Sequence, residues 1–540
     1  MKYSYATKVL QCGNGVENAE TLLKEKVLQI GLGESEFCVL RGKTHIILDF
    51  GKELSGGARI LTYGIQGEKT VRLRFGESAS ETCAALTSEG GTATNDHSLR
   101  DFCVDLQMYS DMTFGGTGFR FLRIDSLDEN SVFTIKTVVA AVDTDTREEL
   151  GSFECDDPLV NQIWNTAAYT LRLCLQNGFI WDGIKRDRLV WIGDLYPEMR
   201  TAHCLFGDIP ETVRCLDFAQ MQTPLPEWIN GIPPYSLWWL IIMADEFVVN
   251  GDKEAFGKYL PYAKGLIEQI APHISENGIT SYSYNFIDWP SNYVAGDPKE
   301  KEEDCIAGVT YLTKIAVEKT KWFLSLYGED VGLCNELLNR LSKMDIHVNN
   351  YKQIAALGVW AGDVSANNKE VLLRGGAKGL STFMSYPILT AVAKYGEYDT
   401  ALSMMKEYYG GMLSVGATTF WEDFDLAWLE GCCRLDEIPK EGQKDIHGDY
   451  GAFCYKGFRH SFCHGWSAGV VPYLVETVAG IKMEGAGMRR IIITPHLSGL
   501  KHVKVNVPTA YGTVTVEHTL KEDGKVDTKV SAPSEVEIII

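Results

Sequence analysis

The stretch ECDDPLVNQIWNTAAYTLRLCLQNG, residues 154–178, divides the chain into a β part before it and a long helical part after it. Asp157 followed by Pro158 is typical of a helix start, because aspartate accepts hydrogen bonds from free N–H groups and proline fits the first turn. We expect Gly178 to close this helix. One apolar helix face is predicted by the spacing of Ile163, Trp164, Ala167, Leu171 and Leu175.

Residues 1–150, before this stretch, carry β patterns. Alternating apolar and polar residues in THIILDFG (44–51), KTVRLRFGE (69–77) and GFRFLRID (118–125) predict strands of an antiparallel β-sandwich. We interpret Gly115, Gly116 and Gly118 as a turn between strands rather than a phosphate-binding loop.

Beyond this stretch, residues 151–486 have helical periodicity in about a dozen segments, joined by loops rich in Gly, Asp, Pro and aromatic residues. This pattern favours a toroid of helical hairpins over a bundle, and the loops at one mouth of such a toroid can meet around a ligand. Residues 487–540 alternate again and predict a second, smaller β domain.

Composition narrows the class of partner. The chain has 540 residues with 51 Lys+Arg against 72 Asp+Glu, a formal net charge of −21. Such a surface repels phosphate backbones and anionic lipids, so we expect neither a nucleic-acid nor a membrane partner. No secretory signal is visible, and the 14 cysteines have no CxxC pair. We therefore expect reduced thiols and a cytoplasmic location. A homo-oligomer stays open.

One loop concentrates charge and indole. WDGIKRDRLVWIGD, residues 181–194, carries Asp182, Asp187 and Asp194 at spacings too irregular for one solvated helix face. Arg186 and Arg188 flank Asp187, and their pairing with it would lower its pKa. The alternative interpretation of this segment is an ion-paired loop that fixes the first helical hairpin.

Three further segments combine ionisable groups with tryptophan: GATTFWEDFDLAWLEG (416–431), YNFIDWPS (284–291) and FRHSFCHGWSAG (458–469). Each segment alone is weak evidence for a binding site, since an acid beside a tryptophan usually marks a capped helix end. Together they suit a sugar, whose C–H faces stack on indole and whose hydroxyls bond to charged side chains. Breaking a glycosidic bond then needs two carboxyl groups, one to protonate the leaving oxygen and one to activate water or attack.

Other chemistries lack their motifs. The sequence has no GxSxG, no P-loop and no HExxH. His447, His460 and His464 lack tight ligand spacing, so we expect no metal and no cofactor, with a structural calcium left open.

These motifs carry a family resemblance that spans almost the whole chain. DGIKRDRLVWIGD, GATTFWEDFD and SFCHGWSAG resemble, in order, three motifs of the α-L-rhamnosidases of glycoside hydrolase family 78. GKELSGGARI (51–60) and VNVPTAYGTVTVEH (505–518) are similar to the β domains of these enzymes. The resemblance implies an (α/α)6-barrel catalytic domain between N- and C-terminal β-sandwiches, and hydrolysis of α-L-rhamnosides with inversion.

The resemblance also implies roles for individual residues. The general acid falls on Asp187 and the general base on Glu422, while the sugar would be held by Asp182, Asp194, Trp191 and His464, with Arg186, Trp238, Trp289 and Trp421 as further pocket members. Many relatives have Glu at the acid position, whereas this chain has the shorter Asp187, so Asp182 and Asp194 remain alternatives.

Two other classes stay open. One is another (α/α)6 sugar-active enzyme, a glucuronyl hydrolase or lyase, which would need an unpaired Arg or Lys for a carboxylated sugar. The other is a non-catalytic carbohydrate-binding relative. The motifs do not identify the aglycone or the linkage, nor do they separate rhamnose from sugars that differ at one substituent.

Overall fold

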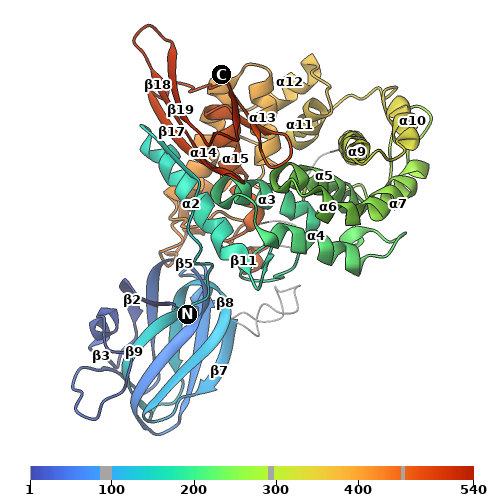
Figure 1. Cartoon of the computed structure of the whole chain (residues 1–540). Helices are drawn as coiled ribbons and strands as arrows, with labels where there is room; N and C mark the ends of the chain where they lie inside the picture. The colour runs from blue at the N-terminus through green and yellow to red at the C-terminus, as the bar shows by residue number, and fades with distance from the viewer. Residues whose placement is uncertain (1, 85–99, 290–296, 452–455) are drawn as a thin grey trace.

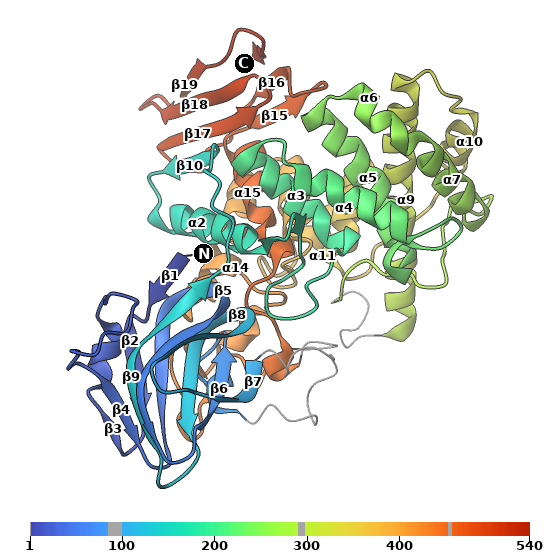
Figure 2. The ribbon, with the colours of Figure 1, turned by 60° about the horizontal axis from the view of Figure 1, so that its bottom comes forward.

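A computed structural model describes residues 2–84, 100–289, 297–451 and 456–540 of the chain. Figure 1 places the N-terminal strands at the bottom, the helices above them and the C-terminal strands at the top left. The turned view of Figure 2 keeps this order, with the helix that begins at Pro158 between the two β regions.

Strands of residues 2–142 form one antiparallel sheet in the described part of the chain. Its order is β3-β4-β9-β5-β8-β6-β7, with β1 on β9 and β2 on β5. The strands are β1 (Lys2–Tyr5), β2 (Lys8–Cys12), β3 (Val16–Glu17), β4 (Cys38–Arg41), β5 (Thr44–Gln66), β6 (Thr70–Gly76), β7 (Asp101–Asp105), β8 (Ser110–Ser126) and β9 (Val132–Val142). The three predicted strand segments lie in β5, β6 and β8, which confirms them.

The predicted glycine turn was wrong, because Gly115, Gly116 and Gly118 lie inside β8. The pairing of β8 with β5 shifts register here, so the glycines form a bulge that bends a long strand. Gly115 has φ +83°, a value that favours glycine, and a Cβ on Gly118 would lie 2.7 Å from the side chain of Ile184. The bulge therefore lets β8 approach the loop that contains Ile184.

The predicted helix start is confirmed. Helix α2 runs from Pro158 to Cys174, and the Asp157 carboxylate accepts hydrogen bonds from the N–H groups of Leu159 (2.9 Å) and Val160 (3.4 Å). Gly178 does not close it. The chain turns at Gly178 (φ +80°) between β11 (Leu175–Gln176) and β12 (Phe179–Ile180), a two-stranded hairpin.

The Asp157 cap gives a stability prediction. Replacing Asp157 by Ala removes both cap bonds and the ion pair of Asp157 with Lys406, so we expect a loss of about 1–2 kcal/mol. Denaturant unfolding followed by circular dichroism measures it. Asp157→Asn is the matched control, since it keeps the cap and loses only the ion pair. An Ala variant as stable as the parent would contradict the capping role.

The described helices of the central region pack into a ring. Each helix contacts the next in the series α3, α5, α9, α11, α13 and α15, and α15 contacts α3, which closes the ring. The helices are α3 (Ile192–Phe206), α4 (Pro210–Gln222), α5 (Pro233–Asn250), α6 (Lys253–Phe256), α7 (Leu260–Ile270), α9 (Pro298–Leu326), α10 (Gly332–Leu341), α11 (Lys352–Trp360), α12 (Ala366–Leu373), α13 (Ser385–Lys394), α14 (Tyr398–Ser414) and α15 (Val470–Tyr473), with short turns η2 (Glu81–Cys83), η8 (Gly465–Gly469) and η9 (Leu474–Val478). Among these helices, none combines the length and apolarity needed to cross a bilayer.

The C-terminal strands form two sheets in the described residues. One has the order β10-β17-β18-β19 and the other β15-β16-β20. The strands are β10 (Ser152–Cys155), β15 (Ile481–Glu484), β16 (Arg490–Ile493), β17 (His502–Thr509), β18 (Gly512–Leu520), β19 (Val526–Ser531) and β20 (Glu537–Ile539). Thus β10 and β15, which lie inside the predicted helical range 151–486, belong to C-terminal sheets.

The apolar core explains this arrangement. Phe153 of β10 and Val503 and Val505 of β17 belong to the same buried cluster as the helices, whereas residues of β4, β5, β6, β8 and β9 form a cluster of their own. The C-terminal sheets therefore share a core with the helical region, whereas most of the N-terminal sheet has a core of its own and only Phe121 of β8 among its described buried strand residues joins the helical cluster.

Candidate active site

Main-chain hydrogen bonds join the three sequence motifs. The N–H of Gly465 donates to the Asp182 carbonyl (2.7 Å), and the N–H of His464 donates to the Phe420 carbonyl (3.0 Å). The N–H of Glu422 donates to the Ser461 carbonyl (3.0 Å). Segments from opposite ends of the helical region therefore meet at one place through the backbone.

Hydrogen bonds join the two ends of the loop that follows β12. Asp182 binds Leu189 twice, because its carboxylate accepts from the Leu189 N–H (2.8 Å) and its own N–H donates to the Leu189 carbonyl (3.1 Å). Asp187 and Arg188 have φ of +54° and +58°, which is strained for residues other than glycine. Helix α3 begins at Ile192, so Asp194 lies on its first turn rather than on the loop.

Arg186 connects the two predicted catalytic carboxylates. Its Nη1 donates to Asp187 Oδ2 (3.0 Å), its Nη2 donates to Glu422 Oε2, and its Nε donates to the Arg459 carbonyl (2.9 Å). Two oxygens that accept from the two terminal nitrogens of one guanidinium lie within about 8 Å of each other. Asp187 and Glu422 therefore share one site. The Asp187 side chain is 26% exposed and that of Glu422 only 5%.

Arg188 does not pair with Asp187 as its position in the sequence suggested. Its Nε donates to the Ile184 carbonyl (3.1 Å), its Nη2 donates to the Gly116 carbonyl, and its guanidinium lies 5.7 Å from the Trp181 ring centroid. It therefore ties the loop to β8 of the N-terminal sheet and leaves Arg186 as the nearer cation to Asp187, with Arg459 at 3.9 Å.

Two more predicted sugar-binding acids are buried beside this pair. Burial raises the pKa of Asp182 well above its usual range, and the neighbouring Asp194 and Asp187 raise it further. Burial also raises the pKa of Asp194, although the Tyr235 hydroxyl donates to it (3.1 Å). Burial and two acids, Asp194 and Asp182, likewise raise the pKa of Glu198, one turn along α3. Sequence analysis missed Glu198, whose only signal is its i+4 spacing from Asp194.

His464 lies between two of these acids. Its Nε2 is 3.8 Å from Asp182 Oδ2 and 3.7 Å from Glu422 Oε1. Burial lowers the pKa of His464 well below its usual range, and the Arg186 charge lowers it further. A neutral imidazole at this position can donate one hydrogen bond to a carboxylate or to a sugar hydroxyl.

The predicted tryptophans divide into two groups. Trp191 and Trp289 are half-buried, and the Trp191 ring lies 6.2 Å from Tyr235, which itself binds Asp194. Trp421 is fully buried with its face 4.0 Å from the Phe462 ring, so the prediction that it contacts sugar was wrong. Trp238 is 2% exposed and packs on Tyr196, which leaves little of its ring for a ligand.

The N-terminal sheet supplies acids that sequence analysis missed. Glu77 accepts from the Phe462 N–H (2.7 Å), and its carboxylate lies 3.2 Å from Lys185 Nζ. Glu81 lies 2.9 Å from the same ammonium group and pairs with Arg100. These buried charges hold Lys185, next to Arg186, and residue Phe462, next to Ser461, in place. No local pattern could reveal them, because the contacts join distant parts of the chain.

Lys185 also accounts for a cluster with metal-like spacing. Ligand atoms of Glu77, Glu81 and His447 lie within 4.8 Å of one another. The Lys185 ammonium contacts both carboxylates and lies 3.2 Å from His447 Nε2, so a cation already occupies this cluster. Burial raises the pKa of Glu77 to about 7, whereas Arg100 and Lys185 outweigh burial at Glu81 and lower its pKa to about 2.

Removing this ammonium group should destabilise the protein. Lys185→Met removes the ammonium group from two fully buried carboxylates and leaves Glu81 paired with Arg100, so we expect a loss of about 3–5 kcal/mol. Thermal and urea unfolding measure the loss. The triple variant Lys185→Met/Glu77→Gln/Glu81→Gln should recover part of it. A Lys185→Met variant with parental stability would show that the buried charges do not fix this junction.

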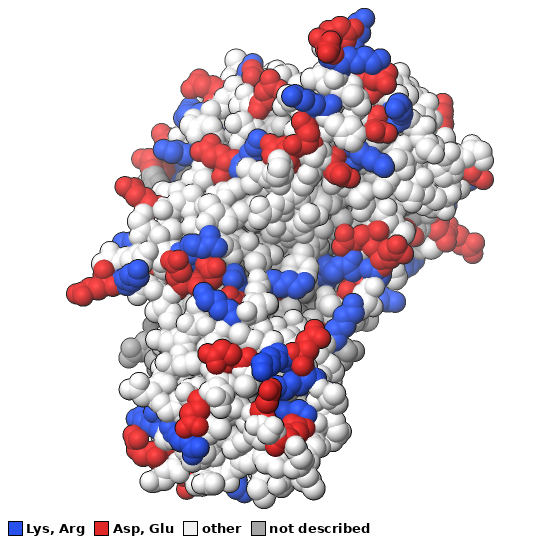
Figure 3. All heavy atoms as spheres, turned by 90° about the vertical axis from the view of Figure 1, so that its left-hand side faces the viewer, with Lys and Arg blue, Asp and Glu red and all other residues white. Residues whose placement is uncertain are grey.

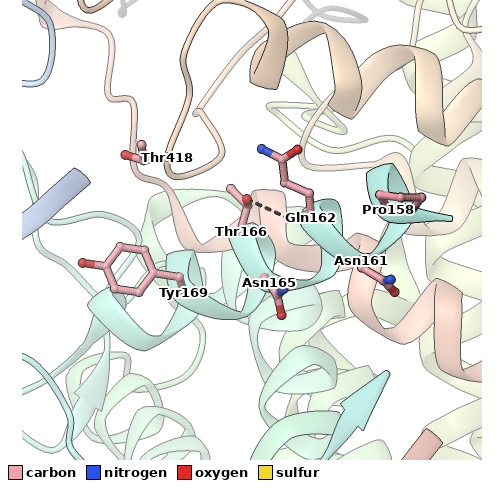
Figure 4. A pocket seen from close by; sticks show the side chains of 7 residues that line it. All are labelled: Pro158, Asn161, Gln162, Asn165, Thr166, Tyr169 and Thr418. Carbon is pink, nitrogen blue, oxygen red and sulfur yellow. Dashed lines mark hydrogen bonds between the residues drawn. The ribbon is translucent and has the colours of Figure 1, made fainter. Parts of the chain in front are cut away.

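Two cavities lie away from these carboxylates. One of about 480 Å³ is lined by neutral residues of α2 and by Thr418. Figure 4 shows Asn161 and Asn165 pointing away from Thr418, and none of the seven lining residues carries a charge. It lacks the carboxyl pair that glycoside chemistry needs. The other, of about 450 Å³, lies between α3, α13 and β15.

Comparisons with known proteins fit this geometry. Residues 148–321 match the family model described as the bacterial alpha-L-rhamnosidase six-hairpin glycosidase domain, and residues 480–540 match that of the bacterial alpha-L-rhamnosidase C-terminal domain. Two segments of the chain therefore match domain models of bacterial α-L-rhamnosidases. The resemblance seen in the sequence is thereby confirmed.

Three proteins named as rhamnosidases are similar to the chain. An alpha-L-rhamnosidase of Formosa agariphila is 22% identical over 91% of the chain and 54% of its own length. The crystal structure of a family 78 rhamnosidase of Bacillus sp. GL1 has a TM-score of 0.73 at 20% identity, over 96% of this chain and 55% of that one. A Klebsiella oxytoca rhamnosidase with rhamnose bound has a TM-score of 0.65 at 19% identity, over 81% of this chain and 88% of that one.

The chain thus spans about half the length of the Formosa and Bacillus relatives. At these identities the solved structures establish the shared fold, and the activity of this chain has to be argued from its own residues.

Proposed function

We propose that the chain removes terminal α-L-rhamnose from a glycoside by hydrolysis with inversion. The single observation that carries this proposal is the shared contact of Asp187 and Glu422 with Arg186. Asp187 and Arg186 lie in the segment 148–321 that matches the rhamnosidase six-hairpin domain. The arrangement of the domains belongs to the same proposal. The ring of helices would be the inner layer of an (α/α)6 barrel, and the flanking sheets would be β-sandwiches.

Glu422 has the surroundings of a general base. The Arg186 guanidinium and the Ser461 N–H (3.3 Å) both donate to Glu422 Oε2, which fixes the position of this oxygen. Its other oxygen lies 3.7 Å from His464 and can accept the proton of an attacking water. Thr382 and Trp466 donate to its main-chain carbonyl, so the carboxylate has a fixed direction.

Asp187 is our candidate for the general acid. Its side chain is the more exposed of the pair, as is needed to reach the leaving group at the rim of the site. Arg186 donates a hydrogen bond to it here, so Asp187 must exchange this contact for the glycosidic oxygen when substrate binds. Asp182, Asp194, Trp191 and His464 would bind the sugar, as the resemblance implies, with Trp289 beside them.

The charge pattern favours a neutral sugar. The site arginine is already paired with two carboxylates, whereas a glucuronyl hydrolase or lyase needs a cation for the substrate carboxylate. A cytoplasmic location and the lack of nucleic-acid or membrane partners stay parts of this proposal, and a homo-oligomer stays open.

A panel of nitrophenyl glycosides tests the function. We expect release from the α-L-rhamnoside, little release from the α-L-mannoside, and none from the β-D-glucuronide. NMR during the first turnovers should show β-L-rhamnose as the initial product, because inversion changes the anomer once. Initial α-L-rhamnose would overturn inversion. Release from none of the substrates, with rhamnose still bound, would favour a non-catalytic binding protein.

A further inference from the structure

A second cavity lies behind the candidate active site, at the junction of the helices with the C-terminal strands. Its volume is about 450 Å³, within the range of small-molecule sites, and side chains of α3, α5, α9, α11, α13, η9 and β15 line it. Arg200 lies six positions after Asp194 on α3, about 9 Å farther along the helix, and none of the residues that line the cavity belongs to the candidate active site. It is therefore distinct from the Asp187–Glu422 site.

Aromatic rings form part of its wall. Tyr196, Trp360 and Tyr386 pack edge to face or tilted on one another, with centroids 5.5 to 6.4 Å apart. Trp360 is held by a hydrogen bond from its Nε1 to Thr390 (3.0 Å). At the rim, Tyr398 and His496 stack at 3.6 Å. Such surfaces suit the C–H faces of a saturated ring.

The charges of the cavity do not balance. Its two carboxylates are already paired, Asp245 with Lys319 and Arg200, and Glu476 with Arg200 and the Tyr386 hydroxyl (2.6 Å). Lys394 and Lys482 also line it, and neither has an ion pair with a described residue. In a chain of net charge −21, two uncompensated ammonium groups at one cavity attract an anion.

Arg200 adds a donor inside the cavity. Its Nε is buried and makes no hydrogen bond within the described part of the chain, although both terminal nitrogens are engaged. An unmade bond of a buried guanidinium is costly. Thr477 and Thr494, which line the cavity as well, can bind ligand hydroxyls.

From these observations we propose that this cavity is a second ligand site, for a sugar acid of monosaccharide size. The ring lies against Tyr196, Trp360 and Tyr386, and the carboxylate binds Lys394 and Lys482. The site does not depend on rhamnosidase activity. Since its walls come from both the helices and the C-terminal strands, an occupied site ties these two parts together.

Calorimetric titration of the full chain with sodium glucuronate tests the proposal. We expect a Kd of about 1 mM or tighter for a compound of this size. Glucose, which lacks the charge, and inorganic phosphate, which lacks the ring, should each bind at least tenfold more weakly. Glucuronate should also raise the thermal unfolding midpoint of the parent.

Matched variants locate the binding. Lys394→Gln/Lys482→Gln should weaken glucuronate at least tenfold and remove the shift in the unfolding midpoint, whereas Lys8→Gln/Lys378→Gln, which changes two exposed lysines elsewhere, should change neither. Glu422→Gln should leave glucuronate binding intact. The proposal is overturned by the absence of glucuronate binding, by phosphate binding equally well, or by binding that Glu422→Gln abolishes and the Lys394/Lys482 variant retains.

Discussion

Glu422→Gln is expected to lower kcat for an α-L-rhamnoside by at least about 10³-fold, the upper part of the range for loss of a general base. Glutamine has nearly the same shape and can still accept from Arg186 and from the Ser461 N–H, so the site should keep its geometry. It cannot take a proton from water. The Kd for rhamnose, measured by calorimetry, should therefore change little while turnover falls.

The control for this variant is Glu430→Gln, which neutralises an exposed acid of the same segment and should be as active as the parent. Asp423 is the competing base, because burial, with Asp288 and Glu422 nearby, raises its pKa to about 7. Full activity in Glu422→Gln combined with an inactive Asp423→Asn would move the base role to Asp423.

Local signals in the sequence predicted the elements that depend on local chemistry. Asp157 and Pro158 marked the start of α2 correctly because a helix cap involves residues within one turn. The glycines of β8 were misassigned because a bulge in a long strand and a turn use the same backbone conformations. The place of β10 in a C-terminal sheet depends on pairing with β17, which no window around Ser152 contains.

In the candidate site, too, residues in local motifs were predicted, whereas residues placed by contacts between distant segments were not. The motifs identified Asp187, Glu422 and His464, and the structure brings them together. Trp421 was misassigned because a tryptophan beside an acid has the same local pattern whether it faces a ligand or packs on Phe462. Glu77 could not be found at all, because its partners Lys185 and Phe462 are reached only through the docking of the N-terminal sheet.

Asp187→Asn should show a loss of activity that depends on the leaving group. A general acid matters most when the departing oxygen is basic, so we expect about a 10³-fold fall in kcat/KM for an alkyl or disaccharide α-L-rhamnoside. A dinitrophenolate leaves without a proton, and its rhamnoside should lose less than about tenfold. Measuring kcat/KM for both substrates with parent and variant separates acid catalysis from a general disturbance of the site.

The same pair of substrates tests whether Asp182 or Asp194 is the proton donor instead of Asp187. Asp182 and Asp194 are buried carboxyls whose raised pKa values favour the protonated form, which a proton donor also needs. Both lie deeper than Asp187, and Asp182 closes the loop through Leu189, so Asp182→Asn should lower activity on both substrates alike. If instead Asp194→Asn or Asp182→Asn loses activity only on the alkyl rhamnoside, the proton comes from that residue. Asp187, held by Arg186, would then orient the substrate.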